Sequence, residues 1–411
     1  MKPLLAVLAL ALVLRVGLIV ATPGFAPFGD PVDYDRIAVT LSELGSFAPT
    51  GLADPGGPSA LRPPAYPLLL AATYEVTGQR FTAGRLLGAL LGTATVLLVH
   101  LLAVRLSNRR VALWSAAVAA VAPPLILLNG SLLSESLFTP LVLTVALCVL
   151  AHRERSRWWL AAAAGGLLGL TVLTRSNGLV IALPLVIGLA HQTGRARLAA
   201  PAIALACTAL VLVPWTVRNA SAFERFLPTG TQTGYTMAGA WSAKATEGGA
   251  GNTFWLVPQT VPVFADLFGR PDVDEADLDA ELRSRALDFA ARDPGAVLAA
   301  LVTNLPRTFD LGPGHTDTTN TANLEMAVPA SAAGLLRVAT YGLLLLTLAG
   351  ALLMPHARGR WWFWLMPVLI HAGVVLWLSS PRYAAPLYAF MAIPCGAALA
   401  VGVTRLRAAR A

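Results

Sequence analysis

MKPLLAVLALALVLRVGLIVATPGFAPFGDPVDYDRIAVTL, residues 1–41, joins a long apolar run to a cluster of three aspartates. A helix needs about 20 apolar residues to span the hydrocarbon core of a bilayer, and residues 3–22 supply that length. Arg15 within the run, and the lack of a small-x-small cleavage site after it, predict a retained membrane helix rather than a cleaved signal peptide. Asp30, Asp33 and Asp35 are then expected at the membrane surface.

The composition of the whole chain is that of a membrane protein. Of its 411 residues, 56% are hydrophobic and 13% are charged, whereas a soluble domain carries roughly 25% charged residues. The mean hydropathy is +0.65. We therefore predict an all-α multi-pass membrane protein with about ten transmembrane helices. The predicted spans are residues 3–22, 82–105, 111–128, 136–152, 158–175, 177–192, 197–215, 334–354, 361–379 and 383–404.

The net charge of +8 arises from short basic clusters between the apolar runs, and these clusters alternate onto one side of the predicted topology. Loops rich in Lys and Arg stay in the cytoplasm, so both termini are predicted to be cytoplasmic and the aspartates extracytoplasmic. All 22 acidic residues except Glu154 fall on the outer face, which agrees with this orientation. Because topology accounts for the basic residues, no nucleic-acid partner is expected. The scarcity of lysine indicates a GC-rich bacterial genome, and hence a bacterial plasma membrane.

The chain divides into three predicted parts. An N-terminal transmembrane module, residues 1–215, includes a first outer loop at 23–80. A small, mostly helical extracytoplasmic segment, 216–333, and the C-terminal transmembrane helices, 334–411, follow. We expect the catalytic residues in the first module and acceptor recognition in the middle segment.

Local signals predict helices within both outer segments. In the first loop, residues 31–43 have helical composition, and the double proline of RPPAYPLLLAATYEV, 62–76, opens a second juxtamembrane helix, because proline suits the first helical turn. In the middle segment, residues 272–305 predict two helices, with Asp293 capping the second. Residues 229–252, rich in Gly and Thr, predict a loop.

The aspartate cluster has two interpretations. Asp30 before Pro31 has the pattern of a helix N-cap, and Asp33 in the first turn would favour the positive end of the helix dipole. Alternatively, Asp30 accepts a proton from an acceptor hydroxyl at the membrane surface. The two roles compete, because a carboxylate that receives backbone N–H bonds has a lower pKa and is a weaker base. The local pattern leaves both open.

Several arginines lie near the outer ends of the predicted spans. They are Arg15, Arg62, Arg85, Arg175, Arg218, Arg337 and Arg382. Such arginines commonly extend to the interface, with no further role. Outer positions gain nothing from the positive-inside rule, however, and guanidinium groups bind phosphate in bidentate fashion, so the set indicates an anionic ligand.

Two further residues near the same membrane edge have a structural and a functional interpretation. Glu135 stands alone in NGSLLSESLFTP, either as a solvated or capping residue or as the partner of one of the arginines. Tyr34, four residues after Asp30, lies on the same helix face or anchors the helix at the interface.

Metal and disulfide chemistry have weak support. Cys148, Cys207 and Cys395 all fall within apolar runs, and the six histidines are scattered singly without metal-ligand spacing. Asp30, Asp33 and Asp35 can in principle hold a divalent cation. We expect no resident metal or other cofactor.

The motifs together resemble the GT-C membrane glycosyltransferases, in the branch of the protein O-mannosyltransferases and the lipid A aminoarabinose transferases. The motifs, in the family's order, are LVLRVGL, GDPVDYDRIA, RPPAYPLLLA, SESLF, GLLGLTVLTRSNGLVIALP, VPWTVRNASAF and SPRYAAPLYAFMAIP. The resemblance covers residues 10–400 and is weakest over 229–330.

This resemblance implies transfer of a sugar from a polyprenyl-phosphate carrier, with inversion, to a lipid, glycan or protein hydroxyl on the extracytoplasmic side. It implies that Asp30 is the catalytic base. Asp33, Tyr34 and Glu135 are assisting candidates. The candidates for binding the donor phosphate are Arg62, Arg218, Arg382 and Arg15.

A transporter or flippase for a lipid-linked or anionic solute is the alternative. Arg15 inside a span and the Pro-interrupted helices fit it. Against it, the sequence has no inverted repeat of the kind common in transporters, and its acidic motif lies in an outer loop rather than at the bilayer midplane.

Overall fold

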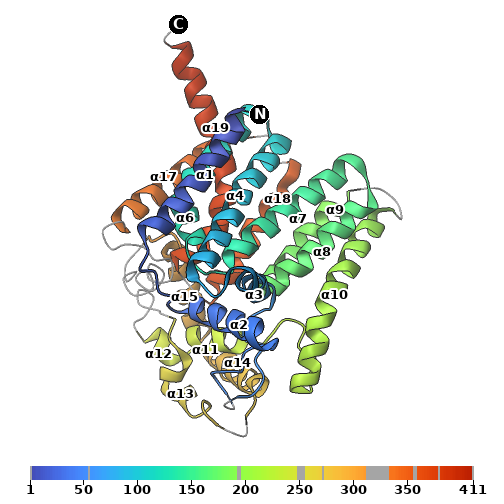
Figure 1. The fold of residues 1–411 in the computed structure, drawn as a ribbon, viewed down its shortest axis with the longest axis vertical. Helices are drawn as coiled ribbons and strands as arrows, with labels where there is room; N and C mark the ends of the chain where they lie inside the picture. Colours follow the sequence, from blue (N-terminus) through green and yellow to red (C-terminus); the bar gives the residue numbers. More distant parts are fainter. Residues whose placement is uncertain are drawn as a thin grey trace.

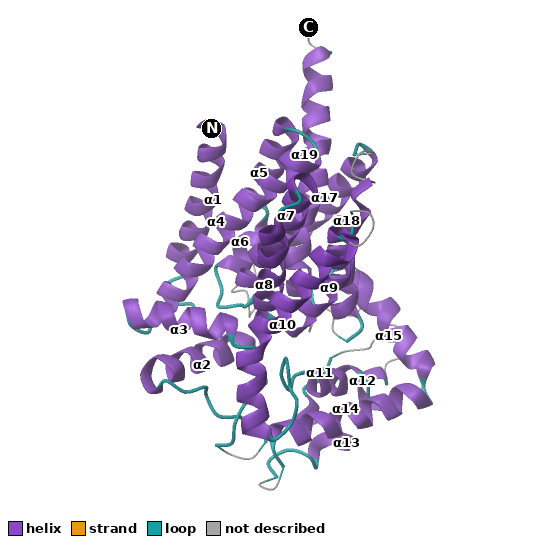
Figure 2. Cartoon of the chain, turned by 90° about the vertical axis from the view of Figure 1, so that its right-hand side faces the viewer, coloured by secondary structure: helices purple, strands orange, loops and turns teal. Residues whose placement is uncertain are grey.

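The computed structural model describes residues 2–53, 56–191, 196–247, 255–270, 273–311, 333–354, 359–377 and 380–409, and all regular elements in these ranges are helices. Long helices form a bundle, and shorter helices lie across one of its ends (Figures 1 and 2). Both termini lie at the opposite end (Figure 1).

Six helices are long and apolar enough to cross a membrane. They are α1 (Lys2–Ala21), α4 (Phe81–Leu106), α7 (Glu135–Arg155), α10 (Ala196–Phe223), α17 (Ala333–Leu352) and α19 (Ala385–Ala408). A bent pair, α5 (Arg109–Val121) and α6 (Pro123–Asn129), makes a seventh span if taken together. The shorter apolar helices are α8 (Trp158–Thr174), η1 (Ser176–Ile181) continued by α9 (Ala182–Leu189), and α18 (Trp361–Val375).

The predicted multi-pass helical fold is therefore confirmed. Each of the ten predicted spans coincides with one of these apolar helices or pairs, although length and composition alone support six or seven full crossings. The remaining three are short, and two of them fall in 136–215, where prolines interrupt the apolar pattern. Residues 192, 378 and 379 of the predicted spans lie outside the described residues.

Small residues bring the apolar helices close together. A Cβ on Gly165 of α8 would lie 2.0 Å from the carbonyl oxygen of Ala204 in α10. A Cβ on Gly350 of α17 would lie 1.7 Å from the carbonyl oxygen of Pro394 in α19. At these positions the two helices contact each other backbone to backbone. Membrane helices commonly associate in this way, because the hydrophobic effect does not drive helix association within lipid and close packing does.

Arg15 stabilises the break between α5 and α6. Pro123 and Pro124 have no N–H to donate to the carbonyls of Ala119 and Ala120, which lie four residues earlier. The Arg15 guanidinium donates to both, with Nη2 3.4 Å from the Ala119 oxygen and Nη1 3.2 Å from the Ala120 oxygen. Its Nε donates to the side-chain oxygen of Asn129 at 3.1 Å. The intramembrane charge thus has a structural function.

We expect Arg15→Met to destabilise the protein by on the order of 3 kcal/mol, because hydrogen bonds to a charged group are worth about 1.5–3 kcal/mol and two carbonyls lose theirs. Thermal unfolding in detergent measures the loss. Arg157→Met, which removes an exposed arginine, is the matched control. Equal transition temperatures for the two variants would contradict this role for Arg15.

The helices predicted in the first outer loop are confirmed as α2 (Asp30–Leu44) and α3 (Ala65–Thr77). Those predicted at 272–305 are α14 (Glu275–Arg292) and α15 (Pro294–Arg307), and Asp293 Oδ1 accepts the Ala296 N–H at 2.9 Å, as the capping pattern indicated. The described residues outside the long helices also form the short helices α12 (Ala243–Thr246), η3 (Pro258–Thr260), α13 (Pro262–Ala265) and η6 (Pro381–Ala384). The division at residues 215 and 333 stays a prediction.

The loop predicted at 229–252 is partly wrong, because it contains α11 (Thr233–Ala240) and α12. Glycine at position 234 has little helix propensity, yet it lets α11 lie against α14: a Cβ there would be 1.9 Å from the Asp279 carbonyl oxygen. The Asp279 carboxylate accepts the Gly234 N–H at 2.6 Å. Packing between helices thus overrides local propensity. Residues 248–252 lie outside the described residues.

Candidate active site

The start of α2 positions Asp30 at one end of the helix bundle. Gly29 occupies the N-cap of α2 with φ 67° and ψ −132°, a conformation that glycine adopts without strain, and Asp30 and Pro31 follow in the first helical turn. The interpretation of Asp30 as the N-cap is therefore wrong, and the cap residue makes no side-chain hydrogen bond to the helix. The Tyr34 ring of α2 packs edge-on against the Tyr66 ring of α3, with centroids 5.1 Å apart. The two helices lie across the end of the bundle (Figure 2).

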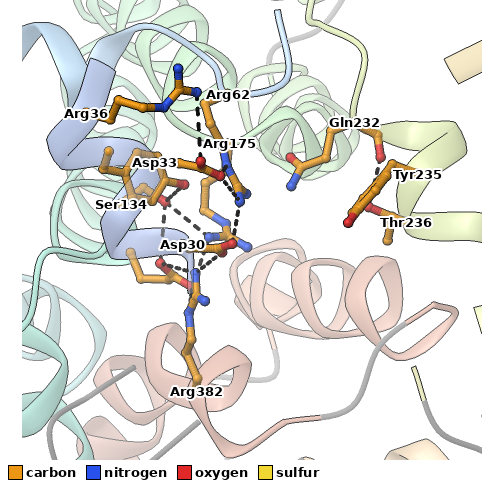
Figure 3. A network of polar contacts seen from close by, with 12 residues as sticks. Asp30, Asp33, Arg36, Arg62, Ser134, Arg175, Gln232, Tyr235, Thr236 and Arg382 are labelled. Atoms are coloured by element: carbon orange, nitrogen blue, oxygen red, sulfur yellow. Dashed lines mark hydrogen bonds and ion pairs between the residues drawn. The ribbon is translucent and has the colours of Figure 1, made fainter. Parts of the chain in front are cut away.

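Three carboxylates and three arginines meet beside this helix start, and we call them the ionic cluster. They are Asp30, Asp33, Glu135, Arg62, Arg175 and Arg382. Figure 3 shows this network, with its two aspartates and its three arginines labelled. The cluster draws on α2, α7, η6, the loop before α3 and the end of α8.

Asp30 bridges two arginines of the ionic cluster. One carboxylate oxygen pairs with Nη2 of Arg62, and the other lies 2.7 Å from Nη2 of Arg382. Arg62 also donates to Asp33, from Nη2 at 2.9 Å and from Nε at 3.2 Å. Arg382 is fully buried, whereas the Asp30 side chain is 20% exposed, so Asp30 lies at the accessible edge.

Glu135 forms the buried base of the ionic cluster. It is the first residue of α7, and its side chain is 1% exposed. Its oxygen Oε1 lies 2.8 Å from Nε of Arg382 and 2.9 Å from Nη1 of Arg175. Of the two interpretations of Glu135 from the sequence, the one in which it partners an arginine matches these contacts.

Ser134 connects Tyr34 to the ionic cluster. The Tyr34 hydroxyl donates to Ser134 Oγ at 2.9 Å, and Nη1 of Arg175 donates to the same oxygen at 3.1 Å. The Arg62 guanidinium lies over the Tyr34 ring, 5.5 Å from its centroid. Tyr34 thus positions two of the arginines without contributing a charge.

The surroundings of Asp30 keep it ionised. Burial by itself would raise the pKa of Asp30, but the positive charges of Arg62 and Arg382 lower it well below the usual range of an aspartate. Burial would lower the pKa of Arg62, yet the negative charge of Asp30 raises it above its ordinary value. Burial also raises the pKa of Tyr34, so its hydroxyl remains a hydrogen-bond donor.

These shifts predict how stability depends on pH. Because the pKa of Asp30 is lower in the folded protein, its contribution is complete above about pH 3.9, the ordinary pKa of aspartate, and is lost as the pH falls toward the folded pKa. We expect the difference in unfolding temperature between wild type and Asp30→Asn to be constant from about pH 7 to about pH 5 and to shrink below about pH 4. A difference that already shrinks between pH 7 and pH 5 would contradict the low pKa.

Arg218 lies beside the loop that carries Arg62 rather than in the ionic cluster. Its Nη1 donates to the Ser59 carbonyl at 2.8 Å, and its guanidinium lies 5.1 Å from the Trp215 ring centroid. The buried Glu275 holds the same loop, accepting from Ser59 Oγ at 2.9 Å and from the Ala60 N–H at 2.8 Å. Arg218 therefore supports the position of Arg62, and its assignment to the donor phosphate remains a prediction.

The other predicted residues do not join the ionic cluster. The Arg15 contacts described above lie at the α5–α6 break. Asp35 accepts a hydrogen bond from the Tyr74 hydroxyl at 2.6 Å, so the three aspartates of α2 do not converge. Among the described residues, no group of three or more His, Cys, Asp and Glu side chains is placed to share a metal ion.

A cavity of about 450 Å³ opens beside the ionic cluster, lined in part by Tyr34 and Arg175. Its polar lining includes Asn177, Gln232 and Thr236, and its apolar lining includes Val374, Leu376 and Trp377. Figure 3 shows the Gln232 amide turned toward the arginines. Within the described part of the chain, the buried Oδ1 of Asn177 has no hydrogen-bond partner. The cavity thus combines hydrogen-bonding groups with an apolar wall.

Sequence reasoning placed Arg175 only in the set of outer arginines that indicates an anionic ligand. It did not single out Ser134, or the cavity residues other than Tyr34 and Arg175. Arg175 had a signal, since it follows an apolar helix in the motif GLLGLTVLTRSNGLVIALP. Ser134 precedes Glu135 in SESLF. No sequence signal marked Gln232 or Thr236, because both lie in the segment that was interpreted as a loop.

The fold is similar to solved structures of an oligosaccharyltransferase from Archaeoglobus fulgidus. The structure of AglB with an inhibitory peptide and a dolichol-phosphate gives a TM-score of 0.57 at 13% identity, covering 99% of this chain and 51% of that chain. The structure with Zn and sulfate gives 0.55 at 17% identity, covering 97% and 49%. ArnT from Cupriavidus metallidurans bound to undecaprenyl phosphate gives 0.47 at 16% identity, covering 96% and 77%. The chain spans about half the length of the archaeal structures, and its fold is of the GT-C type.

Residues 61–217 match the model of the dolichyl-phosphate-mannose-protein mannosyltransferase family. This stretch contains Arg62, Glu135 and Arg175 of the ionic cluster. The family match and the fold together confirm the resemblance to the GT-C membrane glycosyltransferases. No curated protein matched the sequence.

Proposed function

We propose that this protein is an inverting glycosyltransferase that moves a sugar from a polyprenyl-phosphate carrier to an acceptor hydroxyl on the extracytoplasmic side of a bacterial plasma membrane. The observation that carries the proposal is the ionic cluster: Asp30 stands at its accessible edge, between arginines, beside a cavity that is part polar and part apolar. In this proposal both termini are cytoplasmic.

The chemistry requires one base and several cations. The anomeric carbon of the donor carries a phosphate, so the leaving group is already anionic and needs no general acid. As the bond from carbon to phosphate oxygen breaks, negative charge grows on the phosphate and positive charge grows on the sugar, as in glycoside hydrolysis. Arginines stabilise the first charge, and Asp30 accepts the proton that the acceptor hydroxyl loses.

Donor binding would also activate Asp30. Each arginine of the ionic cluster pairs with a carboxylate, so the donor phosphate must compete with Asp30 or Asp33 for Arg62 and Arg382. A phosphate that takes over these guanidiniums removes the interactions that lower the pKa of Asp30. Asp30 then becomes a stronger base when the donor is bound.

The cavity and the comparisons support the same carrier. Leu376 and Trp377 supply an apolar wall for the first isoprene units, and Asn177 and Gln232 supply hydrogen-bonding groups for sugar hydroxyls. The matched family is described by a dolichyl-phosphate-mannose donor, and AglB was solved with a dolichol-phosphate. A polyprenyl-phosphate donor joins a long apolar tail to a polar sugar phosphate, so its site is expected where the bundle meets water.

Turnover of a lipid-linked sugar tests the proposal. Purified protein in detergent would be incubated with polyprenyl-phosphate mannose or arabinose and a mixture of lipid, glycan and peptide acceptors, and release of free polyprenyl phosphate would be followed. We expect release that depends on protein and acceptor. No release with any donor, together with solute uptake by proteoliposomes, would favour the alternative of a transporter or flippase.

A further inference from the structure

A second cavity, of about 630 Å³, lies at the end of the bundle where α4 carries Arg105 and α7 carries Arg153. Its lining comes from the end of α4, the last turns of α7, the residues after α17 and the residues before α18. The chain termini lie at this end of the bundle, and the ionic cluster lies at the other (Figure 1). The family comparisons assign no function to this cavity.

Positive charge predominates in this cavity. Three arginines, Arg105, Arg153 and Arg360, line it, against one carboxylate, Glu154. Arg105 pairs with Glu154, and Arg360 donates to the carbonyl of Arg105. Arg153 has no carboxylate partner among the described residues. It donates to the Gly188 carbonyl at 2.9 Å and lies 5.9 Å from the Trp362 ring centroid.

The remaining lining is apolar. Leu106, Leu150, Leu353 and Met354 contribute to its walls. A cavity for a small inorganic anion would not need these side chains, whereas a lipid presents a charged phosphate joined to glycerol and acyl chains. Arginines that are held in place by backbone carbonyls and an aromatic ring are also suited to bind phosphate with little loss of side-chain entropy.

We propose that this cavity binds the headgroup of an anionic phospholipid, with the phosphate between Arg153 and Arg360 and the glycerol region against the leucines. Basic pockets between membrane helices on the cytoplasmic side commonly bind such headgroups. The site lies at the membrane surface opposite the ionic cluster and does not depend on the proposed transferase activity. If these arginines served only to set the orientation of the chain in the membrane, lipid binding would not depend on whether they line this cavity.

Native mass spectrometry of the protein titrated with phosphatidylglycerol, against phosphatidylcholine, tests the site. We expect Arg153→Gln/Arg360→Gln to weaken phosphatidylglycerol binding by about tenfold or more, since each arginine near a lipid surface contributes about 1 kcal/mol. The matched control is Arg155→Gln/Arg157→Gln, which removes the same charge from exposed positions outside the cavity. We expect it to retain wild-type affinity.

Two further arms complete the test. Glu154→Gln removes the single carboxylate of the cavity and should tighten phosphatidylglycerol binding, a gain that misfolding cannot produce. Inorganic phosphate at millimolar concentration should not displace the lipid. Equal weakening by the two double variants, no tightening by Glu154→Gln, or displacement of the lipid by phosphate alone would overturn the proposal.

Discussion

Asp30→Asn is expected to lower the rate of sugar transfer by about 10²–10⁴-fold, the usual contribution of a positioned general base. Asparagine keeps the size of the side chain and can still accept hydrogen bonds from Arg62 and Arg382, but it cannot take a proton from the acceptor hydroxyl. The rate is measured as release of polyprenyl phosphate under single-turnover conditions, at a temperature below the unfolding transition of the variant. Affinity for the donor should fall much less than the rate, because the arginines remain.

Asp35→Asn is the matched control for this experiment. Asp35 lies in the same helix and is also an aspartate, but its carboxylate accepts from the Tyr74 hydroxyl and does not contact the ionic cluster. Its transfer rate should stay near that of wild type. Equal turnover by wild type and Asp30→Asn would refute the catalytic assignment, even if the protein is a glycosyltransferase.

Glu135→Ala should destabilise the protein by about 3–5 kcal/mol, the usual cost of breaking a buried ion pair by removing one partner. The change leaves Arg175 and Arg382 facing each other without the carboxylate that separates their charges. Repulsion between them should displace η6, the short helix that carries Arg382, and transfer should fall along with stability. Thermal unfolding and the transfer assay on the same preparation measure both effects.

An exposed ion pair provides the comparison for Glu135. Glu247 pairs with Lys244 at 2.5 Å, but both side chains are more than half exposed, so Glu247→Ala should leave the transition temperature nearly unchanged. A second variant, Glu135→Gln/Arg175→Gln, removes charge from both sides of the pair and should be more stable than Glu135→Ala. A transition temperature for Glu135→Ala equal to that of Glu247→Ala would show that the ionic cluster adds little to stability.

Much of the fold could be predicted from sequence, because it follows from local rules. Each membrane helix requires a run of about 20 apolar residues, and the runs coincide with the observed apolar helices. The starts of α3 and α15 follow from proline and capping signals, and α2 and α14 were predicted from the helical composition of their segments. The prediction failed at α11, where a contact with α14 rather than local composition stabilises the helix.

The site was only partly predictable. Asp30 was singled out by its motif, and its position between Arg62 and Arg382 is compatible with that choice without testing it. Arg15 looked like a functional residue because an intramembrane charge usually is one, and the reason for its presence is a double proline more than a hundred residues later. No local pattern connects an arginine to carbonyls at such a distance in the chain.

The sequence by itself determined that the chain is a helical multi-pass membrane protein, which end of the bundle carries the aspartates, and which motif begins α2. These properties depend on apolar length, charge distribution and proline, which act over a few turns of helix. Only the tertiary structure decided which arginines surround Asp30 and which carboxylate lies beneath them, since Glu135 and Arg382 are 247 residues apart in the chain. Ion pairs of this kind form because packed helices bring distant charges together away from water, where each must find a partner.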